Sequence, residues 1–314
     1  MLCLVTGAAG FIGSHLSEEL LRRGHQVIGI DSFIPYYHRS YKDANLTHLL
    51  SRSDFRFHDA DLREADLDAL LPGVEAIFHL AAMPGLPRSW TDFDLYQSCN
   101  LSATHRLLEA ARKLHDLHRF VHVSTSSVYG RYGSGDESMP TRPISPYGVT
   151  KLAAENLCRA HSDEFGLPVV ILRYFSVYGP RQRPDMGYHK FIDAMLRGAT
   201  VTVNGDGLQV RGNTYISDAI EATIASLDAP IGEIYNVGGG ETANVWEILA
   251  KLESILGCRA IIRREPARPG DQRITGADTT KLSRHLNWRP HVGLDEGLSR
   301  QVVWQRSLVQ RLAA

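Results

Sequence analysis

A glycine-rich segment near the N-terminus constrains the fold of this chain more than any other feature. Residues 2–6 have the apolar pattern of a buried strand, and residues 11–23 have the period of an amphipathic helix. Glycines in the turn between them permit a tight bend and let a pyrophosphate approach the free N–H groups of the helix N-terminus. The segment predicts a dinucleotide site formed by Gly7, Gly10, Phe11, Ile12 and Gly13.

Short apolar strands continue to alternate with longer amphipathic helices beyond this segment. Strands are predicted at residues 26–31, 54–59, 75–81, 119–124 and 168–173, and helices at 94–114 and 147–165. The strands are rich in Val, Ile, Leu and Phe, which is typical of strands covered on both faces. The pattern predicts an α/β fold with a doubly wound parallel sheet of the Rossmann type.

The pattern loosens after about Val177, where Gly, Pro, Arg and Asp become frequent. Long loops are predicted at 176–190 and 204–214, and helical patterns at 187–197, 217–228, 243–256 and 294–311. We therefore expect residues 1–175 to form a nucleotide-binding domain that includes the helix at 147–165. Residues 176–314 are expected to form mainly a smaller α/β substrate lobe, with some segments returning to the first domain.

The composition argues against several partners and sites. The net charge is −1 and no long run has one sign, so nucleic acid or an acidic membrane surface is not expected as a partner. No apolar run reaches the length of a membrane span, and Met1 leads directly into the first strand without a signal peptide. The four cysteines and 14 histidines lack metal-ligand spacing. We therefore expect no metal, and reduced thiols in a cytoplasmic protein.

Asp31 ends the second predicted strand and indicates which dinucleotide binds. At this place an acidic side chain can accept hydrogen bonds from the hydroxyls of the adenosine ribose. A carboxylate there repels a 2′-phosphate, and the neighbours Ser32 and Phe33 offer no arginine to receive one. The sequence therefore favours NAD over NADP.

A tyrosine and a lysine are placed to transfer protons. Pro146 precedes a helical pattern, so Tyr147 and Lys151 lie four residues apart on the same face of one helix. A phenol ordinarily has a pKa of about 10, and a fixed ammonium beside it stabilises the phenolate and lowers that pKa. The pair is predicted to act as a general acid/base on a sugar hydroxyl.

Further segments occur in the order found in a known family, namely residues 61–62, 79–82, 124–130 and 173–180. Together with the glycine segment, Asp31 and the Tyr147–Lys151 pair, they resemble the extended short-chain dehydrogenase/reductase family. Specifically, the chain resembles the NAD-dependent nucleotide-sugar epimerases and dehydratases along nearly its whole length. The resemblance implies a Rossmann domain, a C-terminal nucleotide-sugar lobe, and a homodimer built from helices like 94–114 and 147–165.

The resemblance also implies roles for individual residues. Tyr147 is the base, Lys151 holds the nicotinamide ribose, and Thr125 and Ser126 complete the catalytic set. Further cofactor contacts are implied for Asp31, Ser32, Asp61, Leu62, Leu80, Ala81, Ala82 and Tyr174. Contacts with a UDP-sugar are implied for Thr125, Ser126, Ser127, Ser176, Arg183, Arg211, Arg268 and Asp271.

The residues after Thr125 narrow the reaction. The 4,6-dehydratases of the family carry an Asp-Glu pair there, and the UDP-glucuronate decarboxylases usually carry Glu at the second position. This chain has Ser126-Ser127, so elimination lacks its acid/base pair, and decarboxylation is disfavoured without being excluded. The reaction that remains is 4-epimerisation, in which a transient ketone turns over and is reduced from its other face.

Hydroxyl side chains also indicate the sugar. Thr125, Ser126, Ser127 and Ser176 would lie near sugar C5 and C6, and hydroxyl donors bind a carboxylate without adding negative charge. Uronate epimerases of the family often have a hydroxyl residue where Ser176 stands. We therefore prefer UDP-glucuronate as substrate. The sequence leaves open UDP-glucose or UDP-N-acetylglucosamine epimerisation, a UDP-glucuronate decarboxylase, and a catalytically silent dinucleotide-binding relative.

Two further positions depart from related epimerases. An arginine often follows Pro-Gly-Val after the paired alanines, whereas here Pro87 stands there and Arg88 comes one residue later. After Arg211 the family usually has Asp-Phe, whereas this chain has Gly212-Asn213. Because of the first departure, Arg88 is not certain to reach the substrate. The second departure is expected to loosen the loop or to alter how Arg211 is held.

Overall fold

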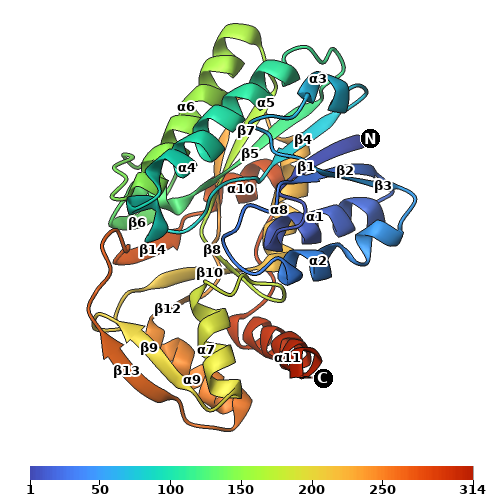
Figure 1. Cartoon of the computed structure of the whole chain (residues 1–314). Helices are drawn as coiled ribbons and strands as arrows, with labels where there is room; N and C mark the ends of the chain where they lie inside the picture. Colours follow the sequence, from blue (N-terminus) through green and yellow to red (C-terminus); the bar gives the residue numbers. More distant parts are fainter. Residues whose placement is uncertain (314) are drawn as a thin grey trace.

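Parallel strands form a large central sheet in the structure, a computed structural model that describes residues 1–313 and their side chains as far as residue 308 (Figure 1). Residue 314, the last of the predicted second lobe, lies outside the described residues. The strand order β11-β7-β5-β4-β1-β2-β3 runs outward from β1 in both directions, which confirms the predicted doubly wound α/β fold. The strands are β1 (Leu2–Thr6), β2 (Gln26–Asp31), β3 (Phe55–Asp59), β4 (Ala76–His79), β5 (Arg119–Thr125), β7 (Val169–Tyr174) and β11 (Ile234–Val237).

Both faces of this sheet are buried. In β1, Cys3 and Val5 pack into one apolar cluster and Leu4 packs into another. The first cluster includes side chains of α1 (Phe11–Arg22) and α8 (Ile216–Ala225), and the second includes side chains of α5 (Ala103–Ala111) and α6 (Pro146–Phe165). Successive residues of a strand point to opposite faces, so burial on both sides requires an apolar residue at every position.

The helix predicted at 94–114 is interrupted in the structure. It is divided into α4 (Phe93–Gln97), a π-helical turn (Ser98–Ser102) and α5. The turn carries Asn100, whose side-chain amide bonds both backbone groups of Met83 and donates to Thr150 Oγ1 at 3.1 Å. The prediction of one continuous helix is wrong because these tertiary hydrogen bonds, which the apolar period does not encode, accompany the π-helical turn.

Helix α6 begins within one residue of its predicted start, because its first turn is capped locally. Ser145 Oγ accepts a hydrogen bond from the Gly148 N–H at 3.1 Å, and Pro146 occupies the first turn. Gly166 ends the helix in the left-handed conformation at φ 67°. Gly148 packs against the backbone of Ser127, just beyond the end of β5, so the first turn of α6 lies at the carboxyl end of the sheet.

The remaining elements are short or lie mainly beyond the carboxyl ends of the central strands. Figure 1 shows α7, α9, α11, β9 and β13 together below the sheet, whereas α8 and α10 return to it. None of the described helices is long and apolar enough to span a membrane. The elements are α2 (Ser40–Leu46), α3 (Leu67–Leu70), β6 (Tyr132–Gly135), β8 (Ser176–Tyr178), α7 (Gly187–Leu196), β9 (Thr200–Asn204), β10 (Arg211–Tyr215), β12 (Thr242–Ala243), α9 (Val245–Leu256), β13 (Ile261–Glu265), β14 (Ile274–Ala277), α10 (Thr280–Leu286) and α11 (Leu294–Ala313).

Two predicted loops contain strands. β8 lies within 176–190, and β10 begins within 204–214. The two strands pair in parallel, with Asn213 opposite Ser176. They are 3 and 5 residues long, so neither shows an alternation of apolar and polar residues that would distinguish it from a loop. The partner strand, distant in the sequence, decides their conformation.

Candidate active site

A large cavity lies at the carboxyl ends of the central strands, where the topology reverses. It is lined by residues that end or follow β1 to β5 and β7, and by the first turns of α6. In open α/β sheets ligands bind at this place. Residues from the C-terminal half close the other side: Ser176, Val177, Arg183, Met186 and Gln272.

The glycine segment brings the backbone directly to the cavity wall. Gly7 has φ +73°, and its N–H donates to the carbonyl of Ile30 at 2.7 Å. A Cβ atom on Gly13 would lie 2.2 Å from the carbonyl oxygen of Gly7, and one on Gly7 would lie 3.1 Å from the nitrogen of Ala81. The predicted loop residues all line the cavity at the N-terminus of α1. This side-chain-free cradle fits the pyrophosphate of NAD.

Asp31 lies at the adenosine end of the cavity, buried and paired. Its carboxylate accepts a hydrogen bond from the Phe33 N–H at 3.0 Å and lies 2.7 Å from Lys42 Nζ. Lys42 comes from α2, a helix that the sequence pattern did not indicate, and it lines the cavity. The other predicted cofactor residues also line the cavity, namely Ser32, Asp61, Leu62, Leu80, Ala81, Ala82, Tyr147, Lys151 and Tyr174.

Lys151 is set deep in the cavity wall. Its side chain is almost fully buried, and its Nζ lies 3.5 Å from Nε2 of His122, a buried residue of β5. Burial lowers the pKa of Lys151 to about 8. Burial also lowers the pKa of His122 well below its usual range, so this ring is a neutral acceptor for the ammonium. Nothing in the sequence pattern marked His122 as a neighbour of Lys151.

Tyr147 lies one turn before Lys151 and also lines the cavity. Burial raises the pKa of Tyr147, while a hydrogen bond from Thr125 and the charge of Arg183 oppose that rise. The expectation of a lowered pKa is therefore wrong for this structure, because removal of the phenol from water outweighs the favourable neighbours. Thr125 and Arg183 are the side chains that favour the phenolate.

The cavity near Tyr147 is lined by hydroxyl groups. Asp31 and Asp61 are the carboxylates among the described lining residues; Asp31 ends β2, and Asp61 follows β3. The described lining around Tyr147 therefore carries no carboxylic acid/base pair. The predicted hydroxyl side chains all line the cavity: Thr125, Ser126, Ser127 and Ser176.

Gln272 is a cavity residue that the sequence did not indicate. Its Nε2 donates to the backbone carbonyls of Ser126 at 3.1 Å and Gly130 at 2.7 Å. Its Oε1 accepts from Ser126 Oγ at 3.4 Å. Because Gln272 directly follows Asp271, it connects a predicted nucleotide-binding segment to the turn that carries the hydroxyl groups.

The predicted substrate arginines do not all face the cavity. Arg183 lines it and is paired with Asp185 at 2.9 Å. Arg211 and Asp271 form an ion pair with each other at 2.6 Å and lie outside the lining residues. Arg268 is exposed in the segment before β14. The structure thus brings Arg211 and Asp271 together but leaves Arg268 facing solvent.

Arg88 does not line the cavity. Its Nε donates to Asp92 at 2.6 Å and its Nη1 donates to the carbonyl of Pro35 at 2.7 Å. These bonds connect the segment before α4 to the segment after β2. In this structure Arg88 therefore holds two loops together.

Gly212 and Asn213 fix the chain beside Arg211 by close packing. Asn213 is 2% exposed, and its Nδ2 donates to the carbonyls of Arg211 and Glu241, each at 3.0 Å. A Cβ atom on Gly212 would lie 3.2 Å from Cα of Gly276. The two residues therefore hold β10 against its neighbours instead of loosening it.

Comparison with known proteins identifies the family. A family model described as the NAD dependent epimerase/dehydratase family matches residues 3–238. The chain belongs to this family. The matched residues contain nearly all of the central sheet, and the match confirms the resemblance and the NAD cofactor expected from the sequence.

Individual relatives match over almost their whole length. The chain is 47% identical to an uncharacterized UDP-glucose epimerase, YtcB, of Bacillus subtilis, with 99% of each chain covered. It is 35% identical to a UDP-glucuronate 4-epimerase of Thermodesulfobacterium geofontis, covering 98% of this chain and 97% of the relative. The crystal structure of UDP-glucuronic acid 4-epimerase from Bacillus cereus, in complex with UDP-glucuronic acid and NAD, matches with a TM-score of 0.96. That match is 44% identical and covers 98% of this chain and 100% of the other.

Proposed function

We propose that the chain is an NAD-dependent epimerase that converts UDP-glucuronate to UDP-galacturonate through a transient 4-keto sugar. The observation that carries this proposal is the chemistry of the cavity near Tyr147, where hydroxyl groups and no carboxylate stand among the described lining residues. The Thermodesulfobacterium relative and the Bacillus cereus complex support the same sugar.

The side chains around Tyr147 suit oxidation at sugar C4. Tyr147 takes the proton of the 4-hydroxyl and later returns it. Thr125 bonds the phenol and Arg183 adds positive charge, and both favour the phenolate while the substrate is oxidised. Lys151 would hold the nicotinamide ribose. Bound NAD would supply a hydride acceptor for oxidation at C4 and the hydride donor for reduction of the ketone.

The hydroxyl side chains suit a uronate and disfavour other outcomes. Ser127 and Ser176 can donate hydrogen bonds to the C6 carboxylate without placing a second negative charge beside it. Elimination would require an acid and a base at C5 and C6, and the described lining carries no carboxylate there. Without these catalysts, rotation of the 4-keto sugar and return of the hydride are favoured over elimination.

We also infer how the protein is organised. Residues 1–175 bind NAD and residues 176–314 mainly bind the UDP-sugar, although β11 and α8 return to the central sheet and its covering layer. Val149 and Phe165 expose large apolar side chains on α6, and Phe93 does so on α4. This exposure favours a homodimer formed through these helices. Cytoplasmic location accords with the free cysteines of the described chain.

The deciding experiment is incubation of the purified protein with UDP-glucuronate, UDP-glucose or UDP-N-acetylglucosamine. NMR and mass spectrometry should show a product of unchanged mass, inverted at C4, from UDP-glucuronate and without accumulation of NADH. Loss of carbon dioxide would replace the epimerase by a decarboxylase, and turnover of the neutral sugars alone would exclude the uronate. Tyr147→Phe should retain NAD and lose turnover, so retained activity would refute the assigned base.

A further inference from the structure

Two buried glutamines connect the C-terminal helix to the 179–186 loop, which joins β8 to α7 and carries Arg183. Gln301 of α11 is 0% exposed and Gln182 of the loop is 3% exposed. The Nε2 of Gln301 donates to Oε1 of Gln182 at 2.8 Å, and its Oε1 accepts from the Gly179 N–H at 2.9 Å. Neither glutamine lines the active-site cavity, and neither takes part in the proposed proton transfer.

Backbone N–H groups fix the orientation of both side-chain amides. The N–H of Gly179 can only donate, so Oε1 of Gln301 faces it and Nε2 faces Gln182. The N–H of His189 donates to Oε1 of Gln182 at 3.0 Å, and Nε2 of Gln182 donates to the carbonyl of Val177 at 3.2 Å. Rotation of either amide by half a turn would bring two donors or two acceptors together. The pair therefore has one satisfied arrangement.

These bonds hold two consecutive turns of the 179–186 loop. The N–H of Gln182 donates to the carbonyl of Gly179, and the N–H of Met186 donates to the carbonyl of Arg183, each at 3.1 Å. Arg181, in the first turn, has φ +66°. This left-handed conformation costs a non-glycine residue free energy, so contacts around it must maintain it. The glutamine pair supplies such contacts on the side of α11.

Helix α11 is itself packed closely against the start of this loop. A Cβ atom on Gly297 would lie 2.2 Å from the hydroxyl oxygen of Tyr178, the last residue of β8. Gln301 comes four residues after Gly297, so its side chain leaves the same face of the helix. The close approach of the helix backbone at Gly297 makes Gln301 a fixed anchor for the loop.

The residue after Gln182 reaches the active-site cavity. Arg183 lines the cavity, and Asp185 accepts hydrogen bonds from its Nε at 2.9 Å and its Nη2 at 3.0 Å. The charge of Arg183 favours the phenolate of Tyr147. Because this electrostatic effect falls with distance, a shift of the loop would weaken it.

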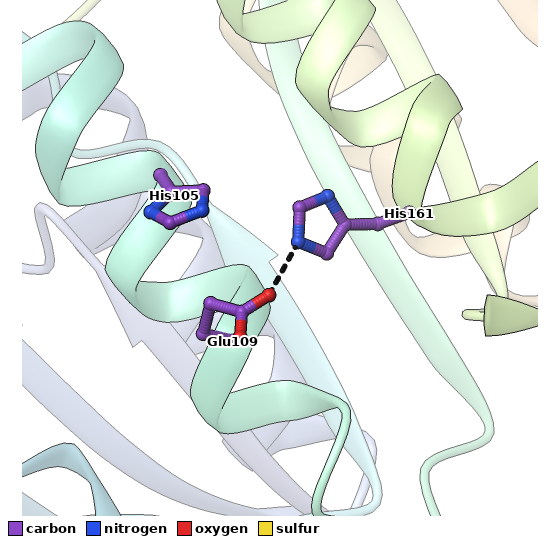
Figure 2. Close-up of side chains that lie close together, drawn as sticks. All are labelled: His105, Glu109 and His161. Atoms are coloured by element: carbon purple, nitrogen blue, oxygen red, sulfur yellow. Dashed lines mark hydrogen bonds and ion pairs between the residues drawn. The ribbon is translucent and has the colours of Figure 1, made fainter. Parts of the chain in front are cut away.

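Another polar cluster, on α5 and α6, has no such connection to the cavity. Figure 2 shows His105 and Glu109 of α5 facing His161 of α6, whose Nε2 lies 2.9 Å from Oε1 of Glu109. None of these three residues lines the cavity or is adjacent in sequence to a lining residue that acts on Tyr147. The cluster joins one helix to another, whereas the glutamine pair holds the loop of a charged cavity residue.

We propose that Gln301 is a positioning residue for the epimerisation, and that it acts through Gln182 and the Gly179 N–H to hold Arg183 in the cavity. The proposal rests on the proposed function, because it gives the guanidinium a part in oxidation at sugar C4. The two glutamines lie 119 residues apart in the sequence. The C-terminal helix thereby determines the place of a charge that acts on the catalytic tyrosine.

The test compares Gln301→Met with Gln305→Met in NAD-loaded protein. Gln305 is the matched control, because it is also buried on α11 but donates to the carbonyl of His189 in α7, at 2.8 Å. Methionine is as long and flexible as glutamine and forms none of these hydrogen bonds. Gln301→Met should lower kcat by on the order of tenfold with little change in KM, because a displaced guanidinium leaves less of Tyr147 as phenolate. Gln305→Met should keep the kcat of the wild type.

A double variant separates positioning from a general loss of stability. In an Arg183→Leu background the guanidinium is absent, so the further change Gln301→Met should lower kcat by less than about twofold. A tenfold loss in that background, an unchanged kcat in Gln301→Met alone, or a rise in KM alone would overturn the proposal. Retained NAD and an unchanged far-ultraviolet circular dichroism spectrum verify that each variant folds.

Hydrogen exchange measured by mass spectrometry gives a second readout that needs no turnover. Peptides covering residues 177–189 should exchange faster in Gln301→Met than in the wild type, because the Gly179 N–H loses its acceptor, and should be unchanged in Gln305→Met. If the wild type epimerises no UDP-sugar, the proposed function fails while this measurement still reports on the anchor. Equal exchange in the wild type and Gln301→Met would show that Gln301 does not hold the loop.

Discussion

Replacing Lys151 by methionine should stabilise the protein at pH 7 while abolishing catalysis. The ammonium of Lys151 is 3% exposed, and its protein partner is His122 Nε2 at 3.5 Å. A buried ammonium with so few acceptors costs stability, which a methionine of similar length does not incur. The prediction concerns protein freed of NAD, because ribose hydroxyls are expected to give the lysine further partners.

The size of the effect follows from the pKa. Burial lowers the pKa of Lys151 from 10.5 to about 8. At about 1.4 kcal/mol for each tenfold change in acidity, the charged lysine costs about 3 kcal/mol at pH 7. Between pH 8 and 10.5 the unfolded chain binds a proton here that the folded chain does not, so this contribution to stability rises with pH. At pH 10 the cost should therefore fall to about 1 kcal/mol.

Urea unfolding at the two pH values measures this difference. At pH 7 the free energy of unfolding of Lys151→Met should exceed that of the wild type by about 3 kcal/mol, and the excess should shrink at pH 10 and on addition of NAD. Lys251→Met is the control, since that lysine is only half-buried and has a carboxylate partner, Asp295, at 2.8 Å. A variant less stable than the wild type at pH 7, or an excess that does not change with pH, refutes the reasoning.

Three other changes test the cofactor loop, the core and the choice of dinucleotide. Gly13→Ala should abolish NAD binding in a calorimetric titration, because its Cβ would lie 2.2 Å from a backbone carbonyl, whereas Gly187→Ala meets open space and should bind normally. Equal affinities in the two variants would contradict this account. Glu155→Ala should lower the free energy of unfolding by about 3–5 kcal/mol, because it leaves Arg173 buried without its carboxylate partner, which lies at 2.8 Å. The double change Glu155→Leu with Arg173→Met should recover most of that loss, and a double variant less stable than the single one would argue against it. Asp31→Asn should weaken NAD binding by roughly tenfold and reduce the preference for NAD over NADP. An unchanged preference means that Asp31 does not select the dinucleotide.

Much of the central sheet could be predicted because its signals are local. β1 and β2 have the predicted bounds, since each is a short apolar run next to a turn. The ends of helix α6 could be predicted because Ser145, Pro146 and Gly166 begin and end the helix through neighbouring residues of the same segment. The π-helical turn was not predictable, because Asn100 bonds Met83 and Thr150 from other parts of the chain. β8 and β10 were missed for the same reason, since each depends on the other.

The candidate site follows the same division. The glycine loop and the Tyr147–Lys151 pair could be found because their spacing lies within single segments. Lys42 and Gln272 could not, because tertiary packing brings them to the cavity from α2 and from the segment before β14. The predicted lowering of the Tyr147 pKa was wrong because burial of the phenol outweighs its favourable neighbours, and the extent of that burial cannot be read from the sequence.

The position of the carboxylates in the cavity bears on which product the Tyr147–Lys151 pair can give. Oxidation at C4 acidifies the C5 proton and makes a C6 carboxylate prone to leave as carbon dioxide, so the ketone has competing fates. Each competing fate is accelerated by an acid or a base near C5 and C6. The described cavity places its carboxylates, Asp31 and Asp61, at the adenosine end, while Gln272 fixes the turn of Ser126 at the sugar end. Neutral hydroxyls of this kind could bind the proposed uronate but supply no base for its C5 proton, and this favours return of the hydride over elimination.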